Sequence, residues 1–504
     1  MRRLAVRRGR MPGGGAGREW ESYTRVRRIA AGAAALLWLA CAPAATPPDA
    51  PAPMTASPTM QQRAADILSE AIRIVTVNPP GDERPLAAYF VALLQGAGID
   101  AAVIETPSGL SQVGRGAAWG RLRGSGRGRP IVLLSHLDVV PADPASWSSG
   151  PFAGQIVDGA VVGRGAIDAK GAAVVQLLAL TELARSNRAL ERDVIFLATP
   201  DEETGGLLGA GYIAKERPEL LHDAEFLLTE GGGISLGDDP ASPVWGIAVT
   251  EKNPCWLQMV STGTPGHSSV PPVDAAVPRL IAALDKVQSI EMPIRVVPAV
   301  EAMFAAMAPL APEKDRSGFA NLGESLDSDS GFRNRFLSNR HYAALVRNTL
   351  TTTVLEGSPR TNVVPQTASA HIDARLLPGD SCESLADRVR SVVADPGIEI
   401  EILLSFPSQI STTDSAVYRA IANVARATDP EATVVPRMIA GFTDAHYFRS
   451  LGIASYGFVP RRFRAGEAEG VHGIDERIST QNLGLGVRTL IEILRELDRV
   501  ESSS

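Results

Sequence analysis

The sequence has few cysteines, no strong excess of one charge and no apolar run of membrane-spanning length. Three cysteines in 504 residues exclude a disulfide scaffold, because Cys41 lies in an N-terminal leader and only Cys255 and Cys382 are left for one internal bridge. The formal net charge of -7, with basic residues dispersed beyond the N-terminus, lacks the positive stripe of a nucleic-acid-binding surface. We therefore expect no nucleic-acid partner.

The N-terminus predicts an export signal. An arginine-rich stretch up to Arg28 leads into an apolar run from Ile29 to Ala42 and a zone of small residues, so we assign residues 1–45 to a signal peptide. The run is shorter than the ~20 residues of a spanning helix, so we expect a periplasmic or secreted protein with no membrane span. A lipid anchor at Cys41 and a start at Met11 are alternatives.

The length predicts more than one domain, and the pattern predicts their class. A Pro/Ala-rich linker occupies residues 46–59, and residues 60–251 then alternate between helical and buried-strand patterns. Strands separated by helices predict an α/β domain with a mostly parallel sheet. Residues 252–406 favour a smaller α+β domain with an insertion near 298–348, and residues 407–504 return to the first pattern and close the first domain.

Three apolar runs of the first domain end in acids or histidine. "IVLLSHLD" carries His136 and Asp138, "VIFLATPDEE" carries Glu202 and Glu203, and "EFLLTEGG" carries Glu230. Ligands bind at the carboxyl ends of strands in open α/β sheets, so these side chains are expected to meet in one crevice.

Two loops complete a predicted metal centre. Asp168 lies in the glycine-flanked loop "GRGAIDAKG", and His472 lies in "EGVHGIDE". With His136, Glu203 and Glu230 they form a nitrogen and oxygen set that suits two zinc ions, replaceable by Co²⁺ or Mn²⁺, with one carboxylate bridging. Asp138 is predicted to orient His136, and Glu202 to act as general base.

The other histidines have structural alternatives. His267, in "GTPGHSS", has no metal partner nearby in the sequence, so spacing alone predicts a structural role. His446 is a weaker rival to His472 as a ligand, and His222, His341 and His371 are expected to be structural. "GRGAIDAKG" lacks the Gly-Lys-Ser/Thr ending of a phosphate loop, which argues against nucleotide binding.

These motifs resemble the M20 zinc metallopeptidases, a family of glutamate carboxypeptidases, aminoacylases, succinyl-diaminopimelate desuccinylases and carnosinase-like dipeptidases. "SHLDVVP", "GRGAIDAKG", "PDEETGG", "TEGG", "GHSS", "NVVP" and "HGIDE" follow the family's order. The insertion near 298–348 is more similar to the carboxypeptidase S and N-acyl amino acid hydrolase branch. The resemblance implies that residues 60–251 and 407–504 form a catalytic domain and that residues 252–406 form a lid that mediates a homodimer. It also implies His136 and Glu230 on one zinc, Glu203 and His472 on the other, and Asp168 bridging.

The resemblance also implies roles for lid residues. His267 matches a histidine that reaches the neighbouring subunit's active site and stabilises a developing oxyanion. Asn362 and Arg375 match positions that hold a substrate carboxylate, and Gly441 matches a glycine of the substrate pocket.

Together these features predict a zinc-dependent exopeptidase or amidase that cleaves small peptides or N-acyl amino acids next to a free carboxylate. Carboxypeptidase or dipeptidase action and the aminoacylase type remain alternatives within this class. A non-catalytic metal-containing binding protein and a dinuclear hydrolase of another bond, such as a phosphoester, are alternatives outside it.

Overall fold

The computed structural model of the protein describes residues 58–107, 109–111, 113–186, 189–221, 223–237, 240–464 and 467–502. The predicted signal peptide, Cys41, His222 and nearly all of the predicted linker lie outside the described residues. Within the described part of the chain, no helix combines the length and apolarity needed to cross a membrane.

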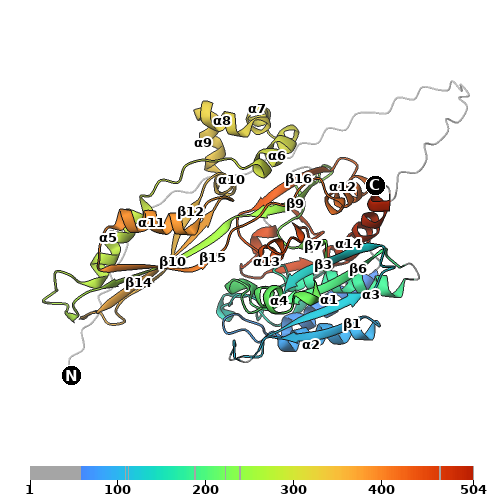
Figure 1. Cartoon of the computed structure of the whole chain (residues 1–504), viewed down its shortest axis with the longest axis horizontal. Coiled ribbons are helices and arrows are strands. Elements are labelled where there is room, and N and C mark those ends of the chain that lie inside the picture. The colour runs from blue at the N-terminus through green and yellow to red at the C-terminus, as the bar shows by residue number, and fades with distance from the viewer. Residues whose placement is uncertain are drawn as a thin grey trace, which may run out of the picture. The chain divides into compact units, whose positions relative to one another are not determined.

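A large sheet forms the centre of the catalytic region (Figure 1). Four neighbouring strands run parallel, because β3 pairs with β6 and β7, and β17 pairs with β7. Antiparallel pairs flank them, and two further parallel pairs, β16 with β9 and β18 with β8, lie toward one edge. In sheet order the strands are β1 (Asp100–Glu105), β2 (Gly116–Leu122), β6 (Arg192–Thr199), β3 (Gly128–His136), β7 (Phe226–Thr229), β17 (Ala454–Gly457), β9 (Val244–Glu251), β8 (Gly233–Leu236) and β18 (Arg462–Arg464), with β16 (Thr433–Ile439) beside β9.

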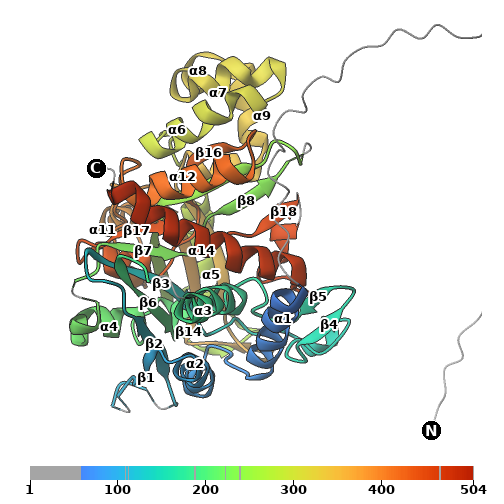
Figure 2. The same cartoon turned by 90° about the vertical axis from the view of Figure 1, so that its right-hand side faces the viewer.

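Helices cover both faces of this sheet, as expected for an α/β fold. The side chains of β3 alternate, with Ile131 and Leu133 packed on one face and Val132 and Leu134 on the other. Figure 2 shows helices of the first face in front of β3, β6 and β7. This face carries α1 (Pro58–Arg73), α2 (Arg84–Gly96), α3 (Lys170–Arg185), α12 (Ala416–Thr428) and α14 (Thr480–Ser502), and the opposite face carries α4 (Ala210–Glu216) and α13 (Ala445–Arg449).

A second, antiparallel sheet has the order β12-β14-β10-β15. Burial alternates along β14, which is the pattern of a sheet with one face packed and one face solvated. The packed face meets two helices in a separate apolar core. The elements are β10 (Asn253–Thr262), α5 (Ala276–Gln288), β12 (Thr349–Glu356), β14 (Thr367–Leu376), α11 (Cys382–Val393) and β15 (Ile398–Ser405).

Two small sheets lie outside these layers. β11 (Gly266–His267) pairs with β13 (Val363–Val364). The other small sheet joins β4 (Gln155–Val157), β5 (Ala160–Val162) and β19 (Arg477–Ser479).

The segment predicted as an insertion folds into short helices around aromatic side chains. Phe304 contacts Phe319, Phe336 and Tyr342 with ring centroids about 5 Å apart. The buried Lys252 holds the end of this segment, because its Nζ donates to the carbonyls of Ala344 and Arg347 at 3.0 and 2.8 Å. The helices are α6 (Pro298–Met307), α7 (Arg316–Ala320), α8 (Leu322–Ser328), α9 (Ser330–Ser338) and α10 (Arg340–Leu345).

A disulfide joins Cys255 of β10 to Cys382, the first residue of α11. Both residues are buried in the apolar core of the second sheet. The bridge closes a loop of 127 residues that contains α5, all five insertion helices and two strands of that sheet. The disulfide therefore links β10, the first strand of the second sheet, to α11, the helix that follows β14.

Replacing both cysteines by alanine should lower the free energy of unfolding by about 2–4 kcal/mol, because the unfolded chain regains the freedom that the closed loop removes. Urea unfolding followed by circular dichroism measures the change. Dithiothreitol should shift the wild-type midpoint to that of the double variant and leave the variant unchanged. A wild-type curve insensitive to the reductant would show that the bridge contributes no stability.

Candidate active site

The predicted site residues lie at the ends of adjacent strands. His136 is the last residue of β3, Glu202 and Glu203 open the short turn η2 (Glu202–Thr204) after β6, and Glu230 follows β7 directly. Because β6, β3 and β7 are parallel neighbours, their carboxyl ends meet at one edge of the sheet. The structure thus brings together side chains that are up to 94 residues apart in the chain.

Asp168 lies between the two histidines. Its Oδ1 is 2.8 Å from His136 Nε2, and its Oδ2 is 3.3 Å from His472 Nε2. Glu230 Oε2 lies 3.7 Å from His136 Nε2, and Glu203 Oε2 lies 3.2 Å from His472 Nε2. Each histidine therefore has one acid of its own, and the two share Asp168.

The acids and histidines of this site shift one another's pKa values. Burial opposes charge on His136, but Glu230, Asp138 and Asp168 outweigh it and hold the pKa of His136 well above its ordinary value. The contacts with Asp168 and Glu203 raise the pKa of His472 to about 10. Burial raises the pKa of Glu203, although His472 opposes the shift. So many carboxylates in a buried position need positive charge among them.

The donor atoms fit metal ions. In the described ranges of the chain, His136, Glu202 and Glu230 form one group of candidate ligand atoms within 4.8 Å of one another, and His136, Asp168 and Glu203 form a second. Imidazole nitrogens and carboxylate oxygens suit zinc and related divalent ions. The site can therefore hold metal, and Asp168 lies between the two histidines.

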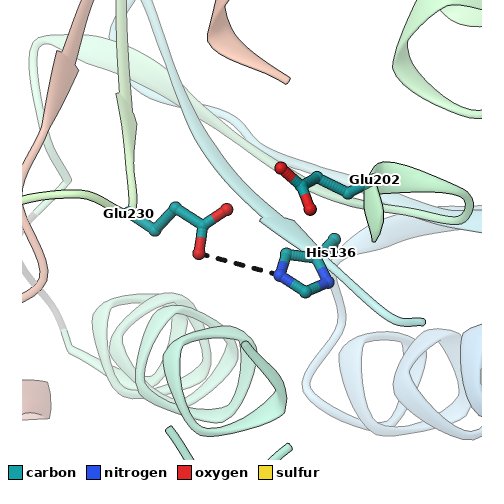
Figure 3. Close-up of side chains that lie close together, drawn as sticks. All are labelled: His136, Glu202 and Glu230. Carbon is teal, nitrogen blue, oxygen red and sulfur yellow. Dashed lines mark ion pairs between the residues drawn. The ribbon is translucent and has the colours of Figure 1, made fainter. Parts of the chain in front are cut away.

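Glu202 is buried and directed at the same group. Figure 3 shows the carboxyl groups of Glu202 and Glu230 both facing the ring of His136. Burial raises the pKa of Glu202 well above its ordinary value; His136 opposes this shift, and Glu230 reinforces it. No hydrogen bond to the Glu202 carboxyl group occurs among the described residues, so this group is free to exchange a proton.

Asp138 fixes the His136 ring and the Glu202 turn at once. His136 Nδ1 lies 2.9 Å from the backbone carbonyl of Asp138 and 3.5 Å from its carboxylate, so the carbonyl is the closer partner. A carbonyl only accepts, so Nδ1 carries a hydrogen and Nε2 is the ring nitrogen directed at the acids. The Asp138 carboxylate accepts from the backbone N–H groups of Glu202 and Glu203 at 3.1 and 3.0 Å.

A buried polar network, absent from the sequence predictions, supports Asp138. Asn78 donates to the Asp138 carboxylate at 2.8 Å and accepts from Arg115 at 2.7 Å. The same guanidinium lies 3.0 Å from both Glu83 and Asp201. Asp201 has a φ of 79°, in the left-handed region, and directly precedes Glu202. Arg115 therefore links the segment of Asn78 and Glu83 to Asp201, the residue before Glu202.

Glu476 ties the Asp168 loop to the segment of His472. Its carboxylate accepts from the backbone N–H groups of Ile167 and Asp168 at 2.7 and 3.0 Å, and from Arg164 at 2.8 Å. Arg164 also donates to the carbonyl of His472. The motif "HGIDE" therefore supplies both a candidate ligand and a support for the Asp168 loop, of which the sequence predicted only the ligand.

A cavity of about 770 Å³ opens over the acids and histidines. Arg375 and Gly441 line it, as do the aromatic rings of Trp256 and Phe442. Arg375 lies over the Phe442 ring at 4.8 Å. His341, expected to be structural, also lies on the cavity wall, where the insertion contributes it from α10.

His267 and Asn362 do not line this cavity. Both are exposed, and they lie together, since His267 pairs with Val363 and Ser268 donates its N–H to the carbonyl of Asn362. His446 is buried, with its ring stacked on Phe406, and it belongs to neither candidate ligand group. Burial lowers the pKa of His446 to about 3. His371 pairs with Gln258 in the second sheet.

Two relatives are similar in sequence to this protein over most of its length. A mouse protein named N-fatty-acyl-amino acid synthase/hydrolase PM20D1 is 31% identical over 73% of this chain and 74% of its own length. A Dictyostelium discoideum protein named probable carboxypeptidase S-like 2 is 29% identical over 70% of this chain and 69% of its own length.

The fold matches as well. A solved M20 family metallo-carboxypeptidase, Sso-CP2 from Sulfolobus solfataricus, aligns over 86% of this chain and 99% of its own with a TM-score of 0.66 at 20% identity. Residues 132–496 match the family described as peptidase family M20/M25/M40. The mixed α/β fold, the His136-centred acid cluster and these matches agree, and the chain belongs to peptidase family M20/M25/M40.

Proposed function

We propose that this protein uses two zinc ions to hydrolyse the amide bond of an N-acyl amino acid or small peptide next to a free carboxylate. The observation that carries the proposal is the placement of the buried Glu202 carboxyl group beside the His136 and Glu230 donors, inside a cavity that Arg375 also lines. The names of the relatives support both substrate types, and the mouse relative favours N-acyl amino acids.

The ligand geometry supports two ions rather than one. His136 with Glu230 would hold one ion, Glu203 with His472 would hold the other, and Asp168 would contact both. Zinc, or Co²⁺ or Mn²⁺ in its place, would polarise the amide carbonyl and make a water molecule more acidic. His136 presents Nε2 as a ligand because its Nδ1 hydrogen is held by the Asp138 carbonyl.

Glu202 is the proposed general base. It would take a proton from the attacking water and return it to the leaving amine, and no hydrogen bond within the described part of the chain occupies its carboxyl group. A protein that only binds ligand has no use for this group. A phosphoester substrate fits less well, because the relatives are named for acyl and peptide chemistry.

His267 is the proposed donor to the developing oxyanion, supplied by a second subunit. The N–H of Ser269 donates to His267 Nδ1 at 3.1 Å, so the ring hydrogen resides on Nε2, which has no partner among the described residues. An exposed donor outside its own cavity needs another chain to be useful, which supports a homodimer. Asn362, beside it, would then help to hold the substrate carboxylate.

Export to the periplasm or beyond is the proposed localisation. It is supported by the N-terminal sequence pattern and by the pairing of Cys255 with Cys382, since such bridges persist in oxidising compartments. Fractionation of cells that express the full chain with a C-terminal tag tests it, and a product confined to the cytoplasm would overturn it.

Glu202→Gln should lower kcat by about 10²- to 10⁴-fold, because the amide cannot take up the proton. Zinc content, measured by mass spectrometry of the metal, should stay at the wild-type value. His136→Ala serves as the counterpart, because it should lose both metal and activity. Activity of Glu202→Gln within tenfold of wild type on N-acyl amino acids and dipeptides would exclude Glu202 as the base.

Arg115→Met should lower both stability and kcat. It leaves Glu83 and Asp201 buried without their cation, at a cost of about 3–5 kcal/mol, and it frees Asn78 and the Glu202 turn. Arg121→Met is the matched control, since Arg121 is also mostly buried between two acids, Asp193 and Asp223, but lies away from the site. The control should lose stability and keep kcat. Equal kcat losses in the two variants would reduce the role of Arg115 to general stability.

Mixing two inactive variants should restore activity if His267 acts across a dimer. When His267→Ala and Glu202→Gln chains are co-expressed with different tags, each mixed dimer has one site with both residues intact. Random pairing then yields about a quarter of the wild-type activity. Mixed dimers purified through both tags that remain inactive would contradict the shared site.

A further inference from the structure

Four arginines line the cavity, namely Arg375, Arg437, Arg461 and Arg464, and they differ in how far the protein neutralises their charge. Arg375 is already paired with Asp373, through two contacts of 2.7 and 3.0 Å. Arg437 of β16 lines the same cavity, and neither an ion pair nor a hydrogen bond of its guanidinium occurs among the described residues. The two arginines therefore differ in how much charge they offer to a ligand.

The sheet is built to hold the Arg437 side chain against it. Arg437 extends over Gly246 of the neighbouring strand β9, where a β-carbon would collide with the Arg437 Cδ. Gly246 is opposed by Gly233 of β8, which also lines the cavity. The Arg437 side chain therefore lies against β9 at Gly246, although the residue is exposed to solvent.

The surroundings of Arg437 do not compensate its charge. Solvent reaches the side chain, yet enough protein surrounds it that burial lowers the pKa of its guanidinium, with no acidic neighbour acting against the shift. At Arg461, on the same cavity, burial has the same effect, but Glu230, Asp168 and Glu476 oppose it. Arg461 thus balances the acid cluster, whereas no acidic side chain balances the charge of Arg437 among the described residues.

The Arg437 guanidinium has no ion-pair partner among the described residues, so its charge and its hydrogen-bond donors are available to a bound anion. The planar guanidinium matches a carboxylate with two parallel hydrogen bonds. We propose that Arg437 forms a subsite for a second carboxylate of the substrate, in addition to the one next to the scissile bond. The preferred substrates are then amides with an acidic side chain or a dicarboxylic acyl chain. This inference rests on the proposed function.

Binding to the metal-loaded Glu202→Gln protein tests the subsite without turnover. Isothermal calorimetry would compare two isosteric pairs: N-acetylglutamate with N-acetylglutamine for the side chain, and N-succinyl-leucine with N-succinamoyl-leucine for the acyl chain. We expect the acid of one pair to bind about tenfold or more tightly than its amide, and the responding pair identifies which part of the substrate meets Arg437.

Adding Arg437→Gln should abolish that preference and leave the affinity for the amide within about threefold. Arg437→Lys should keep part of the preference, because it retains the charge without the fork. Arg419→Gln, on the exposed face of α12, removes one charge elsewhere and should change nothing.

Equal affinity for acid and amide in both pairs would overturn the subsite, as would a preference that survives Arg437→Gln. The comparison of the acid with its amide needs no variant at position 437, so misfolding of one variant does not block the test. Turnover by the metal-loaded wild type is measured separately. Its absence on all four compounds would count against the proposed function, while the binding comparison still decides on the subsite.

Discussion

The Asp138 carboxylate is the contact on which the site depends. It accepts hydrogen bonds from Asn78 and from the backbone of both Glu202 and Glu203, and the carbonyl of the same residue holds His136. One buried residue therefore sets the tautomer of a candidate ligand and the direction of the turn that carries the base. Burial raises the pKa of Asp138, but His136, followed by Asn78 and the backbone N–H of Glu203, outweighs this effect and lowers it. Such a group tolerates little movement, because each of its partners is itself fixed.

The site also joins distant parts of the chain. Glu476 closes the Asp168 loop from the C-terminal segment, more than 300 residues away in sequence. Arg115 links the loop before β2 to the turn after β6. The strands supply the positions of His136 and Glu230, but these long-range contacts set the orientation of the loops between them. A site held in this way forms only when both ends of the catalytic region have folded together.

The sequence predicts those site residues whose side-chain chemistry coincides with the end of a strand pattern. His136, Glu203 and Glu230 end apolar runs, and because ligands bind at the carboxyl ends of parallel strands, the sequence alone predicts that they lie together. Asn78, Arg115 and Glu83 carry no comparable signal, since an asparagine before two prolines and a single arginine are common in loops. The sequence predicts a structural role for His341, because nothing in it indicates that α10 lies at the cavity. The mostly parallel sheet is confirmed, but its antiparallel edge pairs carry no sequence signal, because strands as short as β8 and β18 leave no clear period.

Charge balance separates the roles of the cavity's basic residues. The acids of the His136 cluster exceed the nearby side-chain cations, which is the condition that favours divalent metal. Arg461 is engaged by that cluster through Glu230 and Asp168, and Arg375 is held by Asp373, so neither contributes a full unmatched charge to the cavity. Arg437 has no such counterpart among the residues described. Arg464 of β18 also lines the cavity, so the walls that β16 and β18 form carry positive charge that favours an anion.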